Sequence, residues 1–261
     1  MPIKTIALQI EHTLVKPGAR DSEGAPSGKI RIPGRSDNYL VRLANFQKLS
    51  SADIIIDYSL INQFNLSKSI EFATHYAKSF AISPALYSLD KDLLGLSRNR
   101  VIDTITLFGN PDEPRRRRFL NELDLAGVKS QNMNNVFDST SELYRATKIL
   151  VNIRQTDHHD TLEELRVLPA LRCGVIVISE RSPLVELTRY SKYVIWGELD
   201  ELPAIILDVQ KNYAQWHARI FENPGFIKRI NRISRRNELV SLNISKHINN
   251  QLLKNAYLEN V

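Results

Sequence analysis

The sequence predicts an α/β protein built on parallel β-sheet. Short apolar runs typical of strands recur along the chain, and helical patterns fill most of the gaps between them. This alternation favours parallel strands joined by crossover helices. The expected strands are residues 5–10, 53–56, 101–107, 149–153, 175–178 and 193–196.

The chain of 261 residues is long enough for one large domain or two small ones, and its 43% hydrophobic and 25% charged residues are ordinary for a soluble globular protein. No apolar run approaches the roughly 20 residues that span a bilayer. The first ten residues lack the features of a signal peptide. A single cysteine, Cys173, fits a reducing compartment. We therefore expect a cytoplasmic protein.

Residues 16–37 are rich in Gly, Pro, Ser and charge, without a periodic pattern. This composition indicates either a functional loop or lid, or disorder. The first strand should lie in the middle of an N-terminal sheet, and Glu11 and His12 follow it directly.

The pattern near residue 100 predicts a new Rossmann-like unit. After the strand at 101–107 we expect a helix at 115–123, a short strand at 128–133, a helix at 139–146 with a Ser139 and Glu142 capping box, and a helix at about 199–221. Residues 227–258 carry apolar residues at helical spacing. A helix turns about 100° per residue, so one or two of the arginines at 115–118 should face a ligand.

Residues 145–180 form the most informative segment. A buried strand precedes a polar loop at 154–160, Thr161 and Glu164 match a capping box, and a leucine-rich helix ends at Gly174 before another buried strand. A loop in this position lies at the carboxyl end of a parallel sheet, where such folds bind ligands. Because it leads into a helix N-terminus, it suits a phosphorylated ligand.

This segment, through its ending at residues 171–180, resembles the donor-binding half of glycosyltransferases with the GT-B fold, among them proteins of bacteria and large algal viruses. The resemblance covers residues 100–220. Pro169 stands where the family usually has a glutamate, and Arg166 matches an arginine found on this helix in some branches.

The resemblance implies two Rossmann-like domains facing a cleft. Their expected limits are residues 1–100 for the acceptor side and 101–225 for the nucleotide-sugar side, with a helical tail at 226–261 that could pack back on the N-terminal domain, as a C-terminal helix does in this family. It also implies transfer of a hexosyl or pentosyl group from a UDP- or GDP-type sugar donor to a hydroxyl of a glycan or glycoconjugate, with inversion. No cofactor and no divalent metal are expected to be required.

Two sets of site residues follow. His12 or Glu11 is the expected catalytic base, since either could take the proton from the acceptor hydroxyl. The expected donor-binding residues are Gly109, Asn110, Arg115, Arg116, Arg154, His158, His159, Thr161, Glu163, Glu164 and Arg166.

Structural explanations compete with several of these roles. Glu164 is also explained as the partner of Thr161 in the cap, and Glu163 with Arg166 as a surface ion pair. His158 and His159 suit a metal, but adjacent histidines without a third ligand at standard spacing do not favour one. Cys173 lies between apolar residues before a helix-ending glycine, so we expect a core residue.

The net charge of +6 is also compatible with other anionic partners. Its clusters at 115–118 and 228–236 would attract a diphosphate, an acidic glycan or an anionic membrane surface equally. Two alternative functions remain: a non-catalytic nucleotide- or glycan-binding protein with a degenerate GT-B fold, and a basic nucleic-acid-binding protein. The last has only charge in its favour, because the sequence lacks known nucleic-acid-binding motifs.

Overall fold

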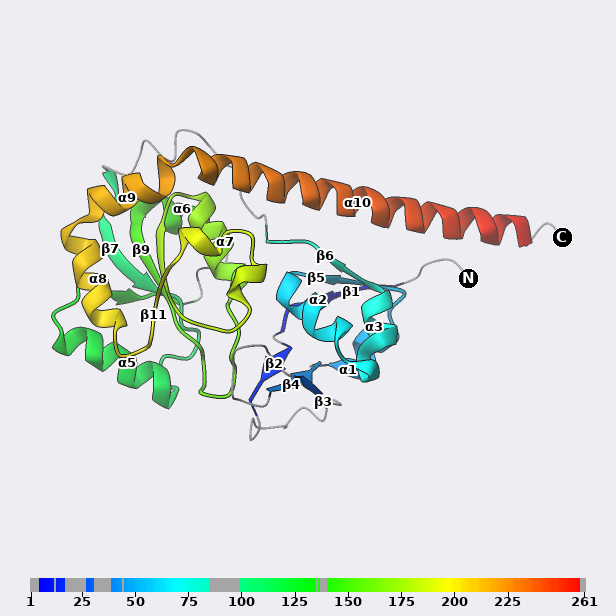
Figure 1. Cartoon of the computed structure of the whole chain (residues 1–261), viewed down its shortest axis with the longest axis horizontal. Helices are drawn as coiled ribbons and strands as arrows, with labels where there is room; N and C mark the ends of the chain where they lie inside the picture. The colour runs from blue at the N-terminus through cyan, green and yellow to red at the C-terminus, as the bar shows by residue number, and fades with distance from the viewer. Residues whose placement is uncertain are drawn as a thin grey trace. The chain divides into compact units, whose positions relative to one another are not determined.

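A five-stranded parallel sheet organises the second half of the chain in the computed structural model (Figure 1). The structure describes residues 5–11, 13–16, 27–30, 39–43, 45–84, 99–134, 136 and 140–258, with the backbone alone at 27–30 and 251–258. The strands lie in the order β11-β10-β9-β7-β8, and every pair is parallel. Their bounds are β7 Ile102–Thr106, β8 Gln131–Asn132, β9 Thr147–Asn152, β10 Ile176–Glu180 and β11 Ile195–Gly197.

The strand order contains a reversal between β7 and β9. β8 pairs with one side of β7, and the chain then returns to place β9 on the other side. In open α/β sheets such a switch leaves a crevice at the carboxyl ends of the two strands, where ligands bind. The loop after β7 and the loop after β9 flank this point.

Helices alternate with these strands, as the sequence predicts. β10 is buried along its whole length, which requires cover on both faces of the sheet. The helices are α5 Pro114–Leu125, α6 Thr140–Ala146, α7 Glu164–Arg172, α8 Leu202–Lys211 and α9 Tyr213–Phe221. One continuous helix expected at 199–221 is wrong: it breaks at Asn212, whose side chain donates to Asp208 at 2.7 Å.

The chain divides into two compact units. Unit 1 contains residues 1–83, 158–161 and 232–261, and unit 2 contains residues 84–157 and 162–231. The α/β class is confirmed in both. The domain limits expected from the sequence, and the arrangement of two domains about a cleft, stay predictions.

Unit 1 contains two small sheets. One is parallel, in the order β1-β5-β6, and the other is antiparallel, in the order β2-β4-β3. The strands are β1 Ile6–Gln9, β2 Leu14–Val15, β3 Ser27–Ile30, β4 Tyr39–Arg42, β5 Ile54–Asp57 and β6 Ser79–Ala81, and the helices before residue 84 are α1 Phe46–Ser50, α2 Leu60–Ser67 and α3 Ala73–Ala77. The antiparallel sheet is a departure from a plain Rossmann-like domain.

Two predictions for this unit are wrong. The first strand is not central among the described strands, because β5 lies between β1 and β6, and Leu8 of β1 is 66% exposed. Part of the region expected to be a loop, residues 27–30, forms β3 through pairing with β4. Strand order and long-range pairing depend on tertiary contacts, which periodicity does not report.

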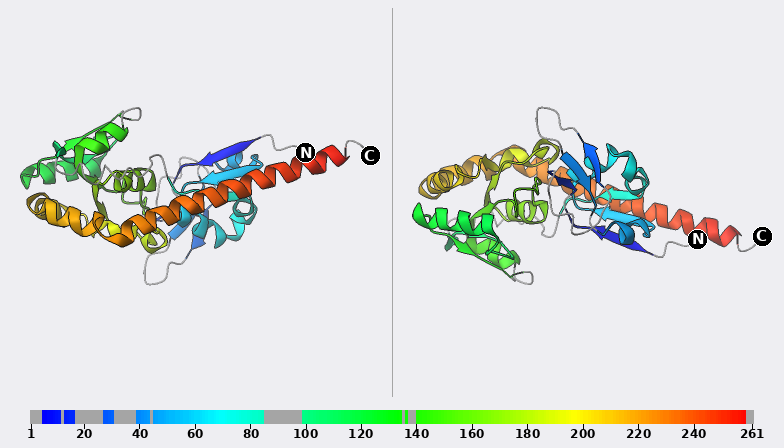
Figure 2. Two further views of the ribbon diagram at one scale, coloured as in Figure 1. Left: turned by 90° about the horizontal axis from the view of Figure 1, so that it is seen from above. Right: turned by 90° about the horizontal axis from the view of Figure 1, so that it is seen from below.

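The C-terminal tail forms a single helix, α10 Pro224–Leu258, which is uninterrupted in both views of Figure 2. At 35 residues it is about 50 Å long. Among the described residues no helix, α10 included, combines the length and the apolar content needed to cross a membrane.

Buried polar groups gather at the amino ends of β7 and β9. Arg100, only 3% exposed, donates to the carbonyl oxygens of Tyr144 and Thr147 at 2.6 and 2.5 Å, and to that of Cys173 at 2.5 Å. Burial raises the pKa of Cys173 to about 11, so its thiol is a core group, as predicted, and a poor nucleophile. Burial and the charge of Arg100 together lower the pKa of His217 to about 4.

The pKa of His217 makes folding sensitive to mild acid. An unfolded histidine titrates near 6.5, so the unfolded chain binds the proton first as the pH falls, and stability is lost from about pH 6.5 down to about 4. At pH 5 the loss from this residue should be roughly 2 kcal/mol. Urea unfolding of a His217→Gln variant should show a profile flatter by that amount between pH 7 and 5.

The matched control is His247→Gln, which changes an exposed histidine. It should keep the wild-type profile, and His75 of unit 1, whose pKa burial also lowers to about 4, should retain its own contribution in both variants. Equal profiles for wild type and His217→Gln would contradict a neutral buried imidazole.

Candidate functional site

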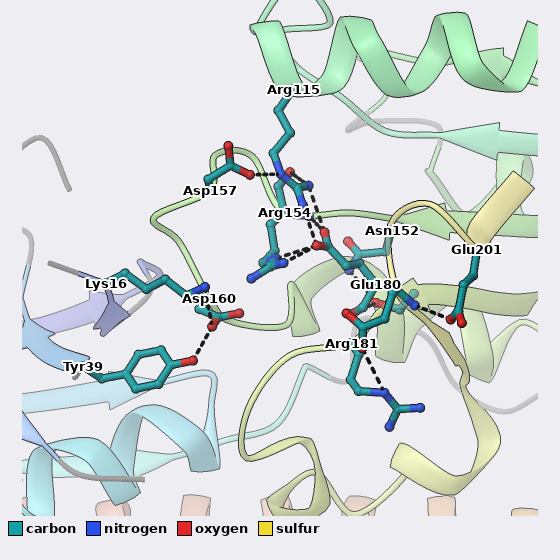
Figure 3. Close-up of polar contacts among 12 residues, drawn as sticks. Lys16, Tyr39, Arg115, Asn152, Arg154, Asp157, Asp160, Glu180, Arg181 and Glu201 are labelled. Atoms are coloured by element: carbon teal, nitrogen blue, oxygen red, sulfur yellow. Dashed lines mark hydrogen bonds and ion pairs between the residues drawn. The ribbon is translucent and has the colours of Figure 1, made fainter. Parts of the chain in front are cut away.

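Two arginines at the carboxyl ends of the five-stranded sheet share one buried carboxylate (Figure 3). Glu180, the last residue of β10, is 2% exposed. Arg115 Nη1 donates to Oε2 at 2.9 Å and Nη2 to Oε1 at 2.5 Å. Arg154 Nε donates to Oε1 at 2.8 Å and its backbone N–H to Oε2 at 3.1 Å, while its Nη2 also donates to Oε1.

Local structure explains why Arg115 reaches this point. Pro114 occupies the first turn of α5, and the Glu113 carboxylate caps the helix by accepting from the backbone N–H of Arg115 at 2.9 Å. The turn between β7 and α5 is fixed by Asn132 of β8. The side-chain amide of Asn132 accepts from Phe108 N at 2.9 Å and donates to Phe108 O at 3.2 Å.

Charge pairing determines the protonation of this cluster. Burial alone would raise the pKa of Glu180, but the hydrogen bonds from Arg154 and Arg115 outweigh it and hold the pKa below its ordinary value. Arg115 Nε also donates to Asp157 at 2.7 Å, and this bond lowers the pKa of Asp157 although its side chain is 76% exposed. Both carboxylates are therefore ionised at neutral pH.

Most hydrogen-bond donors of Arg115 are already used. Its guanidinium has five N–H groups, and the contacts to Glu180, Asp157 and the carbonyl of Arg154 occupy four of them. This geometry suits a residue that holds β10, the loop after β9 and the start of α5 together. Its predicted role in binding the donor stays a prediction.

Arg116 differs from its neighbour. It is 4% exposed, lies 4.9 Å from the centre of the Phe108 ring, and donates to the backbone oxygen of Asn110 at 3.4 Å. Among the described residues no carboxylate lies within ion-pair distance of it, and its buried Nε has no hydrogen-bond partner. Burial, together with the nearby charge of Arg166, lowers the pKa of Arg116 to about 10. The guanidinium remains charged at neutral pH and incompletely paired.

The start of α7 supplies further charged groups near Arg116. Arg166 and Glu163 both act electrostatically on it, and neither side chain is fully exposed. Glu164 is 2% exposed and accepts a hydrogen bond of 2.8 Å from the Tyr190 hydroxyl, which gives it a structural role.

The capping box predicted from Thr161 and Glu164 is wrong. α7 begins at Glu164 with Glu163 in the capping position, and the buried Thr161 hydroxyl makes no hydrogen bond to a described residue. The Glu164 side chain bonds Tyr190 instead of closing the box.

The other predicted site residues are divided between the units. Gly109 and Asn110 are exposed in the turn before α5, in unit 2. His158, His159 and Thr161 belong to unit 1, where His159 pairs with Val15 in an isolated bridge and its Nε2 lies 3.2 Å from Arg42 Nη2. Glu11 is exposed, and His12 lies outside the described residues.

Sequence reasoning missed the acidic partners. Glu180 lies two residues after the strand predicted at 175–178 and is the last residue of β10, so the rule that ligand sites lie at the carboxyl ends of strands could have identified it. Asp160 ends the polar loop at 154–160 that the sequence indicates as a ligand site, but its contacts lie within unit 1: it is 1% exposed, accepts from the Tyr39 hydroxyl at 2.6 Å and lies 3.8 Å from Lys16 Nζ. Within the part of the chain that the structure describes, no group of three or more His, Cys, Asp or Glu side chains could hold a metal ion.

Comparisons with known proteins find similarity in sequence and in structure. No family model matches the chain. It is 25% identical over 141 residues to "Uncharacterized protein R358" of Acanthamoeba polyphaga mimivirus, a match that covers 52% of this chain and 50% of that protein, so the chain spans about half of its relative. The crystal structure of Anabaena Alr3699/HepE in complex with UDP-glucose matches with a TM-score of 0.47 and 13% identity, over 75% of this chain and 64% of that one.

The Glu180 cluster should contribute strongly to stability. Glu180→Gln removes the buried charge that two buried or half-buried arginines share, so we expect a loss of roughly 3 kcal/mol in the free energy of unfolding. The measurement is urea unfolding at pH 7.

A second glutamate–arginine pair provides the control. Glu198 lies 3.6 Å from Arg181, with both side chains largely exposed, so Glu198→Gln should cost less than about 1 kcal/mol. Similar losses in the two variants would mean that burial of the Glu180 pair is not what stabilises the structure.

Proposed function

We propose that the protein is a glycosyltransferase that moves a sugar from a nucleoside-diphosphate-sugar of UDP or GDP type to a hydroxyl of a glycan or glycoconjugate. The diphosphate would bind at the strand-order reversal between β7 and β9. The observation that carries the proposal is Arg116, a buried and incompletely paired cation at this point of the sheet. The resemblance of residues 100–220 to the donor-binding half of GT-B glycosyltransferases also implies binding of a nucleotide-sugar.

The charge of Arg116 fits an anionic ligand. Keeping a guanidinium away from water with incomplete pairing is unfavourable, and a bound anion would reduce that cost. A diphosphate accepts charge-assisted hydrogen bonds from such a group. As the sugar leaves, negative charge develops on that diphosphate, and fixed cations stabilise it most in the transition state.

Neighbouring residues complete the proposed donor site. Arg166 would supply a second cation, and Glu163 would accept hydrogen bonds from ribose hydroxyls, with Gly109 and Asn110 in the adjoining turn. Arg115 and Arg154 would act as positioning residues, because Glu180 holds both.

Glu11 or His12 would accept the proton of the acceptor hydroxyl, which corresponds to an inverting reaction. A true base contributes roughly 10²- to 10⁴-fold to rate, so kcat of the two single alanine variants would identify it or exclude both.

A non-catalytic nucleotide-binding protein is the second candidate. It is favoured by the cluster in which Glu180 already engages Arg115 and Arg154, since fewer cations then remain for catalysis. Binding of a nucleoside diphosphate without transfer or hydrolysis of any sugar donor would support this candidate.

We expect transfer to be independent of divalent metal, because arginines would carry out the charge stabilisation that a metal otherwise supplies. Turnover with a competent donor should be unchanged in EDTA. Loss of turnover in EDTA, with recovery on addition of Mn²⁺, would contradict this mechanism.

Arg116→Met should separate ligand binding from folding. Removing the buried charge should leave the Tm unchanged or raise it, whereas the Kd for UDP or GDP should rise at least about tenfold, since a charge-assisted hydrogen bond is worth roughly 1.5–3 kcal/mol. Calorimetric titration with UDP, GDP and UDP-glucose, together with thermal unfolding, tests both effects.

Arg117→Met is the matched control, because Arg117 is the next residue of α5 and is exposed. It should leave the affinity within about twofold of wild type. A lower Tm with unaltered affinity in Arg116→Met would assign Arg116 a structural role and remove the main support for the proposed site.

A further inference from the structure

One face of α10 is exposed and carries both cations and leucines. Over residues 232–246, all within unit 1, the exposed residues at successive spacings of 3, 4, 3 and 4 form what we call the basic stripe. These spacings keep them on one side of a helix. The basic stripe consists of Arg232, Arg235, Leu239, Leu242 and Lys246.

The opposite face holds the helix in place. Ile233 and Ile244 are 1% and 7% exposed, and the buried Asn237 accepts from the backbone N–H of Ser83 at 3.1 Å and donates to its carbonyl at 2.8 Å. Because this face is anchored, α10 cannot turn its leucines inward without breaking those bonds. The basic stripe therefore stays directed away from the core.

Leu239 and Leu242 are 62% and 57% exposed, unlike most leucines whose side chains the structure describes. They lie between Arg235 on one side and Lys246 on the other. Glu238 is the only acidic residue at 232–246, against three arginines and one lysine, so the segment carries a net charge of +3. A surface of this kind combines an anion-attracting charge with apolar groups that remain unburied.

We propose that the basic stripe docks on the surface of an anionic phospholipid bilayer. Arginine and lysine side chains would bind lipid phosphates, while the two leucines would enter the interface between headgroups and acyl chains. Helices that lie in the plane of a membrane surface combine lysine and arginine with leucine, the kinds of side chain that form the basic stripe.

Two other occupants fit the same surface less well. A nucleic acid would use the cations but leave both leucines in water. A second copy of this helix would bring arginines and lysines of like sign against each other along the seam, which opposes association. The bilayer is the occupant that uses both kinds of side chain.

Vesicle sedimentation tests the proposal. The full chain should pellet with phosphatidylcholine vesicles containing 30% phosphatidylglycerol, as a chosen composition, and not with phosphatidylcholine alone, and added NaCl should weaken binding. Arg232→Gln with Arg235→Gln should lower the partition coefficient about 25-fold, or about fivefold per charge. Leu239→Ser with Leu242→Ser should lower it roughly threefold or more without removing its dependence on salt.

The charge-matched control is Arg117→Gln with Arg118→Gln, which removes two exposed arginines from α5. It should bind vesicles within about twofold of wild type, and all variants should keep the wild-type circular dichroism. An equal loss in this control would mean that net charge, and not the basic stripe, drives binding. Failure to pellet with anionic vesicles, tighter binding to a 20-nucleotide oligomer, or a dimer abolished by the leucine variant would each overturn the proposal.

Discussion

The arrangement of unit 2 depends on one interaction, in which Arg115 and Arg154 share the buried carboxylate of Glu180. It lies at the end of β10, one of its partners follows β9, and the other begins α5, so a single buried group fixes three segments that are distant in sequence. A carboxylate buried alone would protonate or destabilise the fold. Here four side-chain hydrogen bonds from two guanidinium groups and one from a backbone N–H offset the loss of solvation, and the geometry admits little movement.

The fixed position of Arg115 has a consequence for Arg116. Consecutive residues of a helix point about 100° apart, so once Arg115 is held by Glu180, its neighbour must point elsewhere. It meets the Phe108 ring and the turn after β7, where Asn132 leaves the backbone little freedom. A cluster of two arginines held by Glu180, next to an incompletely paired cation, is the arrangement expected of a preorganised anion site, because binding then requires little reordering of the protein.

Secondary structure in unit 2 followed from sequence because β9 and β10 are apolar runs buried on both faces, and their helices carry amphipathic patterns. The start of α7, in contrast, could not be predicted from the sequence. Thr161 and Glu164 match the local pattern of a cap, but the Tyr190 hydroxyl, 26 residues away, donates to Glu164, and His159 forms a bridge to Val15 of β2, so tertiary contacts determine the conformation before α7. The central place of β5, and the pairing of β3 within a Gly- and Pro-rich segment, likewise depend on long-range contacts that no short pattern encodes.

The environment of a charged side chain also depends on long-range contacts, so the sequence does not predict it. Residues 115–118 are four identical side chains in sequence, yet the structure gives them different environments: Arg115 is in a buried ion pair, Arg116 is buried and incompletely paired, Arg117 is exposed, and Arg118 lies 3.7 Å from Glu122 on the surface. Helical geometry predicts that only some of them point inward, but which ones depends on Glu180, 65 residues further on. A net charge of +6 therefore does not identify a partner. Among the described residues, Arg116 and the arginines of α10 form no ion pair with a carboxylate, and such cations are placed to attract an anionic partner.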